Sequence, residues 1–99
     1  MATSTEQVTV LIEIHARAGQ ERQARDGLLH AIETSDKPGL ISSRQYASLD
    51  DPGVFFAVQE WESAEAFHRH MKDAADSGMD EAIRVLSKAP RTALLRAIG

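Results

Sequence analysis

The chain has 99 residues, which is enough for one domain and leaves no room for a second. Lys and Arg number 11 and Asp and Glu number 15, giving a net charge of −4 with no basic stripe. This charge argues against nucleic acid and anionic membrane surfaces as partners. The absence of cysteine excludes disulfides, thiolate nucleophiles and Cys-ligated metal centres. No signal peptide is apparent, and the longest apolar run, residues 54–58, is too short to span a bilayer, so we expect a cytoplasmic protein.

The first third of the chain changes from a strand pattern to a helix pattern. Apolar side chains alternate from Val8 to Ala16, which predicts a strand, and Gly19 ends it. From Gln20 to about Thr34 the apolar spacing becomes helical. A Pro-Gly pair follows, which is typical of a break between elements.

The middle of the chain predicts an antiparallel hairpin. One extended run covers residues 40–49, and a third strand runs from Val54 to about Trp61. The turn at residues 50–53 contains Pro and Gly and is short enough to join the two strands directly.

The last third of the chain predicts a helix and a final strand. Ser63 is a suitable N-cap. Behind it, one helical face carries four side chains at i, i+3, i+4 and i+7 spacing, namely Phe67, His70, Met71 and Ala74. Met79, Ile83 and Leu86 suggest a short further helix. Pro90 ends that segment, and Thr92 to Ile98 reads as the last strand.

The order β-α-β-β-α-β is that of the ferredoxin-like α+β fold, with a four-stranded antiparallel sheet and helices on one face. The third strand is apolar on both sides, with Val54, Phe56 and Val58 on one and Phe55, Ala57 and Trp61 on the other. Helices can cover only one of these faces. We therefore expect a homodimer through the free sheet face, the alternative being a monomer with a mildly apolar surface.

His70 is the ionisable residue of most interest, because it lies within the apolar stripe of the second predicted helix. One interpretation is a core histidine bonded to a backbone carbonyl, which spacing alone favours. The other is a general base or a substrate partner in a small cavity, since its pKa lies near neutrality.

Other candidate residues are weaker. Trp61 is either a core side chain or a wall on which a planar aromatic ligand stacks. Tyr46, Arg44 and Glu60 lie on neighbouring strands and are either pocket residues or cross-strand partners. Phosphate-loop, serine-hydrolase and zinc-protease motifs are all absent.

Metal binding is not expected from the histidines. His68 and His70 are two residues apart and would point to different sides of a helix. His15 falls on a predicted strand and His30 on the first predicted helix. The histidine spacing therefore predicts no metal site.

Residues 10–21 and 46–70 resemble the antibiotic biosynthesis monooxygenase domain family, and the resemblance extends over about 8–98 of the single domain 1–99. Its best marker is Glu60-Trp61-Glu62-Ser63 followed by His70, nine residues after Trp61. The resemblance implies a dimeric α/β barrel with a pocket between sheet and helices in each subunit. Characterised members include oxygenases that make quinones from anthrones or quinols without metal or flavin, haem-cleaving enzymes and isomerases.

Two departures narrow the implied activity. The anthrone-oxidising members carry an Asn four residues before the tryptophan and a Tyr six residues after it, and here these positions are Ala57 and Phe67. The haem-cleaving members carry a second Trp where this chain has His70. The resemblance therefore implies the broad histidine-containing branch, which includes quinol oxygenases.

Three functions remain as hypotheses. The first is a monooxygenase without a cofactor that oxidises a quinol, an anthrone or a polyketide-like aromatic with dioxygen. In it His70 is the base or anchor, and the substrate contacts Trp61, Phe67 and Met71, with Tyr46 and Arg44 as additional candidates. The second is an isomerase or cyclase in which His70 transfers a proton. The third is a binding dimer without turnover.

Overall fold

A computed structural model describes residues 6–34, 37–76 and 83–99 of the chain. Its elements follow one another as β1 (Val8–His15), α1 (Glu21–Thr34), β2 (Leu40–Ala47), β3 (Val54–Trp61), α2 (Ala64–Asp76) and β4 (Arg91–Leu95). This order confirms the predicted ferredoxin-like α+β fold. No helix within the described ranges is long and apolar enough to cross a membrane.

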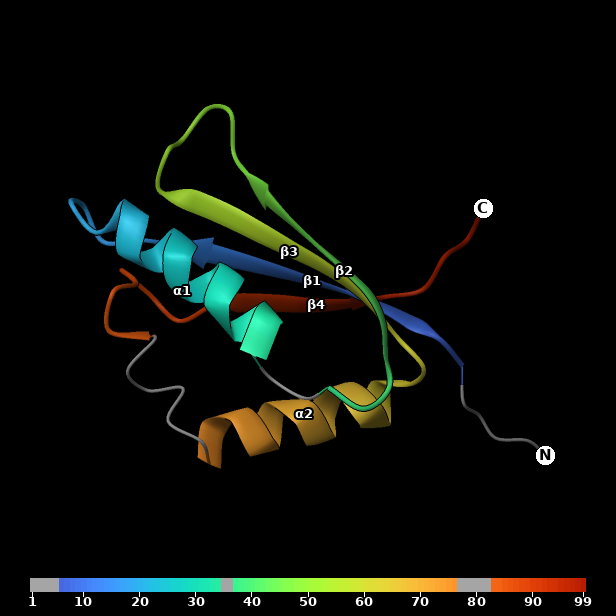
Figure 1. Cartoon of the computed structure of the whole chain (residues 1–99). Helices are drawn as coiled ribbons and strands as arrows, with labels where there is room; N and C mark the ends of the chain where they lie inside the picture. The colour runs from blue at the N-terminus through green and yellow to red at the C-terminus, as the bar shows by residue number, and fades with distance from the viewer. Residues whose placement is uncertain (1–5, 35–36, 77–82) are drawn as a thin grey trace.

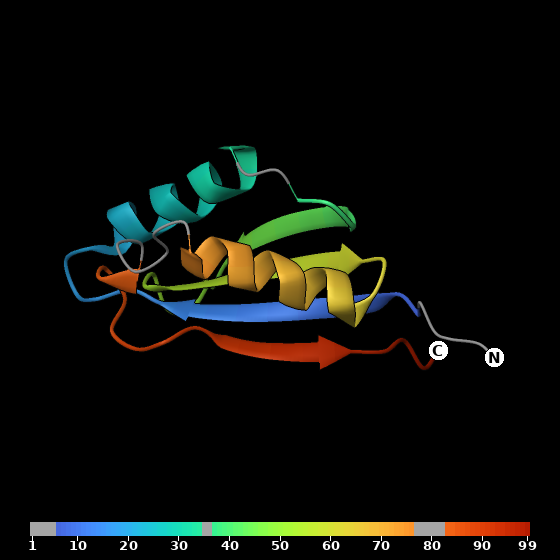
Figure 2. The ribbon, with the colours of Figure 1, turned by 90° about the horizontal axis from the view of Figure 1, so that it is seen from below.

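The four strands form one open antiparallel sheet in the order β2-β3-β1-β4, with β2 and β4 at its edges. In Figure 1, α1 lies in front of one end of the strands and α2 lies below them. Figure 2 shows both helices on the same side of the sheet. One sheet face is therefore covered by helices and the other carries none.

The register between the two central strands assigns side chains to each face. Val8 is opposite Trp61 and Ile14 is opposite Phe55, so these side chains share the face that the helices cover. The intervening residues of both strands point the other way, because side chains alternate along a strand. Among them are the opposed pairs Leu11 with Val58 and Glu13 with Phe56. The third strand is thus apolar on both faces, as the sequence predicts.

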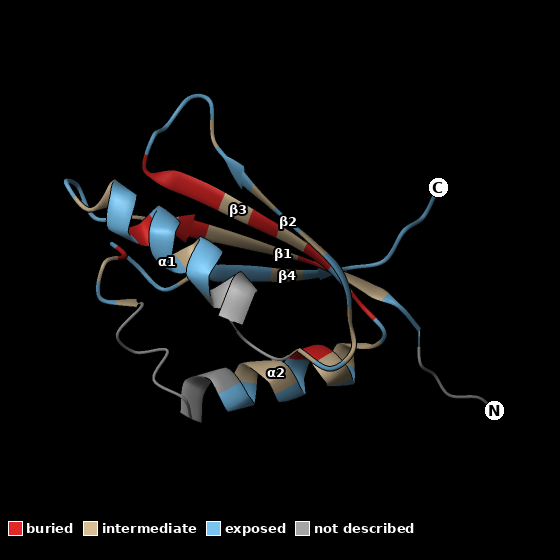
Figure 3. Ribbon diagram, in the orientation of Figure 1, coloured by how far each residue is buried: buried red, intermediate tan, exposed pale blue. Residues whose placement is uncertain are grey.

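The core consists of two neighbouring clusters, one under each helix. Under α1 the buried members are Ile14, Ala24, Phe55 and Leu86. Under α2 they are Val10, Trp61 and Phe67. Ile12 packs against both clusters, and Figure 3 shows burial concentrated along β3 and β1. Each helix therefore packs on its own apolar cluster, and the two clusters share one sheet.

A β-bulge interrupts the pairing of β2 with β3. Leu40 is opposite Trp61, but Ser42 is opposite Glu60, so Ile41 is the extra residue. The bulge reverses the alternation of β2. Leu40 packs into the core under α2, whereas Ser42 and the residues at even positions after it face away from the helices.

Three predicted segments differ from the structure or fall partly outside it. The last strand was expected over 92–98 but covers Arg91–Leu95, because its pairing with β1 runs from Glu13 opposite Arg91 to Thr9 opposite Leu95. The second strand was expected over 40–49 but ends at Ala47, after which the Ser48 hydroxyl accepts turn amides. The short helix predicted from Met79, Ile83 and Leu86 begins outside the described residues, and at its described end Leu86 forms an isolated β-bridge with Ala16.

Candidate functional site

The junction between β3 and α2 brings the principal candidate residues together. Trp61 is the last residue of β3 and Ala64 is the first of α2. The Ser63 hydroxyl accepts a hydrogen bond from the backbone N–H of Ala66 at 3.1 Å, as expected of an N-cap. This cap fixes where the helix begins, and the helical spacing then turns Phe67 and His70 toward Trp61.

Trp61, Phe67 and His70 form an aromatic cluster. Trp61 has no exposed surface and Phe67 only 3%. The Phe67 ring meets the indole edge to face at a centroid distance of 5.7 Å, and the His70 imidazole lies tilted over the indole at 5.2 Å. Met71 packs against the same cluster. Four of the six candidate residues from the sequence are therefore neighbours.

Gln59 was not among the candidates, yet it orients the tryptophan. Its side-chain oxygen accepts a hydrogen bond from the Trp61 indole N–H at 2.9 Å. Gln59 is only 6% exposed, which is unusual for an amide, and its position two residues before Trp61 on the same strand places both on the helix face. A glutamine at an inward strand position is the sequence signal that would have identified it.

The environment of His70 favours its neutral form. Burial lowers the pKa of the imidazole, the positive charge of Lys37 lowers it further, and the Asp73 carboxylate acts in the opposite direction. A neutral imidazole has an unprotonated nitrogen and can accept a proton from a substrate hydroxyl. The ring is only half-buried, so a molecule from solvent can reach it.

Tyr46 and Arg44 do not join this cluster. They are opposite Phe56 and Val58, which puts both on the sheet face without helices. The bulge after Leu40 sets this orientation, because an unbroken alternation along β2 would put residues 44 and 46 on the same face as Leu40. Both side chains are exposed. They therefore do not share a sheet face with Trp61.

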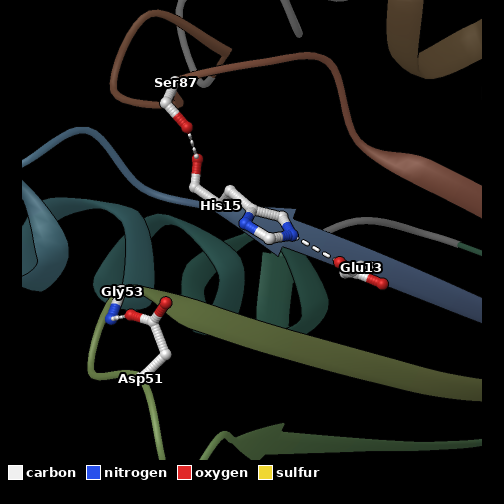
Figure 4. A network of polar contacts seen from close by, with 5 residues as sticks. All are labelled: Glu13, His15, Asp51, Gly53 and Ser87. Carbon is white, nitrogen blue, oxygen red and sulfur yellow. Dashed lines mark hydrogen bonds and ion pairs between the residues drawn. The ribbon is translucent and has the colours of Figure 1, made fainter.

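His68 and His15 make contacts that differ from those of His70. His68 is exposed, and its ring lies 5.7 Å from that of Phe67. His15 is hydrogen-bonded through Nε2 to the Glu13 carboxylate on the free sheet face, and its backbone oxygen accepts a bond from Ser87 (Figure 4). The bond from His15 is the main cause of a lowered pKa at Glu13. Within the described ranges, no group of three or more His, Asp or Glu side chains is arranged to hold a metal.

A pocket of about 520 Å³ lies away from the aromatic cluster, between α1 and the β2–β3 hairpin. Its apolar lining includes Leu28 and Phe55, and Tyr46 also contributes to it. Trp61, Phe67, His70 and Met71 are not among its lining residues.

A family model places the chain. The model of the antibiotic biosynthesis monooxygenase domain matches residues 7–75. The chain belongs to this family. The matched range includes β1, α1, the β2–β3 hairpin, Trp61 and nearly all of α2.

Solved structures share the fold of this family member at low sequence identity. A Pseudomonas aeruginosa protein matches with a TM-score of 0.81 and 14% identity, covering 99% of this chain and 100% of its own. A Methanosarcina mazei protein matches with a TM-score of 0.78 and 17% identity, and the match covers 93% of each chain. A mutant form of SnoaB, named as a cofactor-independent oxygenase from Streptomyces nogalater, matches with a TM-score of 0.75 and 19% identity. The match covers 93% of this chain and 93% of SnoaB. No protein with a curated description matches in sequence.

The structure explains why the two departures from the anthrone-oxidising pattern matter. Ala57 has no exposed surface and Phe67 is only 3% exposed, so both positions are filled by apolar groups on the helix side of the sheet. Neither can donate or accept a hydrogen bond through its side chain. In this family member, the polar side chains of His70 and Gln59 both contact Trp61 on that side.

Proposed function

We propose that this chain is a monooxygenase that needs no cofactor and oxidises a small electron-rich aromatic with dioxygen. A quinol fits better than an anthrone, because the amide and phenol of the anthrone-oxidising members are replaced by Ala57 and Phe67. Family membership supports the class of reaction, as does the description of SnoaB as a cofactor-independent oxygenase. The cytoplasmic location expected from the sequence belongs to the same proposal.

The observation that carries this proposal is the half-buried imidazole of His70 lying against Trp61. Its lowered pKa keeps it neutral near pH 7, so it can take the hydroxyl proton of a bound quinol. The resulting phenolate is electron-rich enough to reduce dioxygen itself. One oxygen atom enters the ring and the other leaves as water, and all four electrons come from the substrate, which becomes a hydroxyquinone.

The surrounding side chains have simpler roles in this proposal. Trp61 and Phe67 provide rigid aromatic surfaces against which a flat ring can lie. Met71 adds a flexible apolar contact. The hydrogen bond from the indole to Gln59 holds the tryptophan in one orientation. Positioning of the substrate beside His70 and exclusion of water are what the protein adds to the reaction.

Oxygen consumption with a panel of hydroquinones and anthrones tests the proposal. We expect the wild-type chain to consume one O₂ per substrate molecule. His70→Gln should lower the rate by about 10²-fold or more, as is typical when a general base is removed. His68→Gln is the matched control, because His68 is exposed on the same helix, and it should leave the rate unchanged.

Other outcomes distinguish the rival functions. No oxygen uptake by the wild-type chain, together with exchange of a substrate proton with deuterated solvent, would instead indicate an isomerase or cyclase. Neither activity, with a ligand that still raises Tm, would indicate a binding protein. Either result would contradict the proposed oxygenase.

We also propose that two copies pack through the sheet face without helices. Leu11, Phe56, Val58 and Ala93 are only partly buried on that face, and Leu95 is 45% exposed. Strands of a sheet with one face in water normally alternate apolar and polar residues, so that the face in water is polar. Here the face without helices is apolar at its centre. Packing against a second copy would remove these side chains from water.

A further inference from the structure

The pocket between α1 and the β2–β3 hairpin is built differently from the surroundings of His70. Its inner wall is apolar and includes Leu28 and Leu29 from α1 and Ala47 from β2. Phe55, only 6% exposed, contributes an aromatic surface from β3. A volume of about 520 Å³ lies within the range of small-molecule sites, roughly 300–1,000 Å³.

Two arginines give this pocket a positive side. Arg22 and Arg25 both line it, and because they are three residues apart on α1 they share one side of the helix. Neither has an ion pair or a side-chain hydrogen bond with another residue in the described part of the chain. Glu21 also lines the pocket, but its carboxylate accepts a hydrogen bond from the Gly19 amide at the entry to the helix.

An apolar wall beside two guanidinium groups without ion pairs among the described residues suits a ligand that has one apolar part and one negatively charged part. The positive side is unusual in a chain with a net charge of −4. Guanidinium groups bind carboxylates in paired, charge-assisted hydrogen bonds and also stack on aromatic rings. The Phe55 surface suits a flat ring.

We propose that this pocket is a second small-molecule site, which binds an aromatic carboxylate with its ring against Leu28 and Phe55 and its carboxylate on Arg22 and Arg25. The site is separate from the aromatic cluster, because none of the cluster residues lines it. It does not depend on the proposed oxygenase activity.

Titration with 2-naphthoate, followed by calorimetry and amide NMR, tests this site. We expect saturable binding, with chemical-shift changes at Leu28, Leu29 and Ala47 and none at Trp61 or His70. The neutral isostere 2-naphthalenemethanol should bind about tenfold more weakly, because it cannot form the charge-assisted bonds. The Arg22→Gln/Arg25→Gln double variant should reduce 2-naphthoate affinity to the level of the neutral compound.

The matched control removes the same charge elsewhere. Arg69 and Arg96 are exposed side chains outside the pocket, paired with Glu65 and Glu6. The double variant Arg69→Gln/Arg96→Gln should leave affinity within twofold of the wild type. The proposal is overturned if both double variants weaken binding equally, if shifts appear at Trp61 and His70 instead, or if 2-naphthoate does not bind at millimolar concentration.

Discussion

At the scale of single residues, the orientation of Trp61 depends on one buried hydrogen bond. Gln59→Leu removes the acceptor and leaves the indole N–H buried without a partner. Such a loss costs about 1–3 kcal/mol of unfolding free energy. Urea denaturation should show this loss for Gln59→Leu in the wild-type background.

The control for this prediction removes the donor as well. In a Trp61→Phe background the indole N–H is absent, so Gln59→Leu should cost clearly less than it does beside Trp61. Equal costs in the two backgrounds would show that the Gln59–Trp61 bond contributes nothing specific.

His70 should make stability depend on pH. Burial and Lys37 lower its pKa in the folded chain, whereas in the unfolded chain it returns to about 6.5. Between these two values the unfolded chain binds more protons, so stability falls as pH drops below about 6.5 and levels off below the folded pKa. Urea unfolding of wild type and His70→Gln across this range should show a smaller pH dependence in the variant, and parallel curves would contradict the assignment.

The sequence predicts well which side chains surround His70, but it does not predict which face of the sheet each residue of β2 occupies. Phe67, His70 and Met71 share a helical face, and Trp61 precedes the cap by two residues, so this cluster depends on local spacing. The face on which Tyr46 and Arg44 lie could not be predicted, because it depends on the register of β2. A single extra residue, Ile41, reverses that register, and no local signal marks it.

At the scale of elements, the entry to β2 depends on a close approach that only glycine permits. Gly39 has a φ of 92°, and a Cβ there would lie 2.6 Å from the Ala66 Cβ on α2. Its backbone oxygen also accepts a hydrogen bond from Glu62 at 2.8 Å. The short stretch before β2 is thus packed directly against the start of α2.

Gly39→Ala should therefore destabilise the fold more than Gly19→Ala does. Gly19 has a similar φ of 86° but open space around it, so its substitution costs only the strain of about 1–2 kcal/mol. Gly39→Ala adds an overpacking cost of about 1–3 kcal/mol. Chemical denaturation of both variants measures the difference, and equal losses would mean that the contact with Ala66 relaxes freely.

The element order was predictable because the hydrophobic period changes cleanly between strands and helices. The ends of the strands were less predictable where pairing with another strand decides them. The last strand, Arg91–Leu95, ends opposite Thr9, near the start of β1, and this limit is set by another part of the chain. The pocket beside α1 was also missed, because it arises from side chains of three separate elements.

At the scale of the whole molecule, the proposed dimer rests on the sheet face without helices. Phe56→Asp places a charge at the centre of this face and should yield a monomer of about 10.8 kDa in size exclusion with light scattering. Leu49→Asp is the control, because Leu49 is fully exposed at the tip of the hairpin, and it should remain dimeric. A monomeric wild-type chain at micromolar concentration would contradict the proposal.

The central claim is that a neutral His70 takes the substrate proton, and the pH dependence of oxygen uptake tests it most directly. The rate should fall as pH drops through the pKa of His70. Lys37→Gln removes a charge that lowers this pKa, so the fall should move to higher pH, while Asp73→Asn should move it to lower pH. Identical pH profiles for the wild type and both variants would contradict the claim.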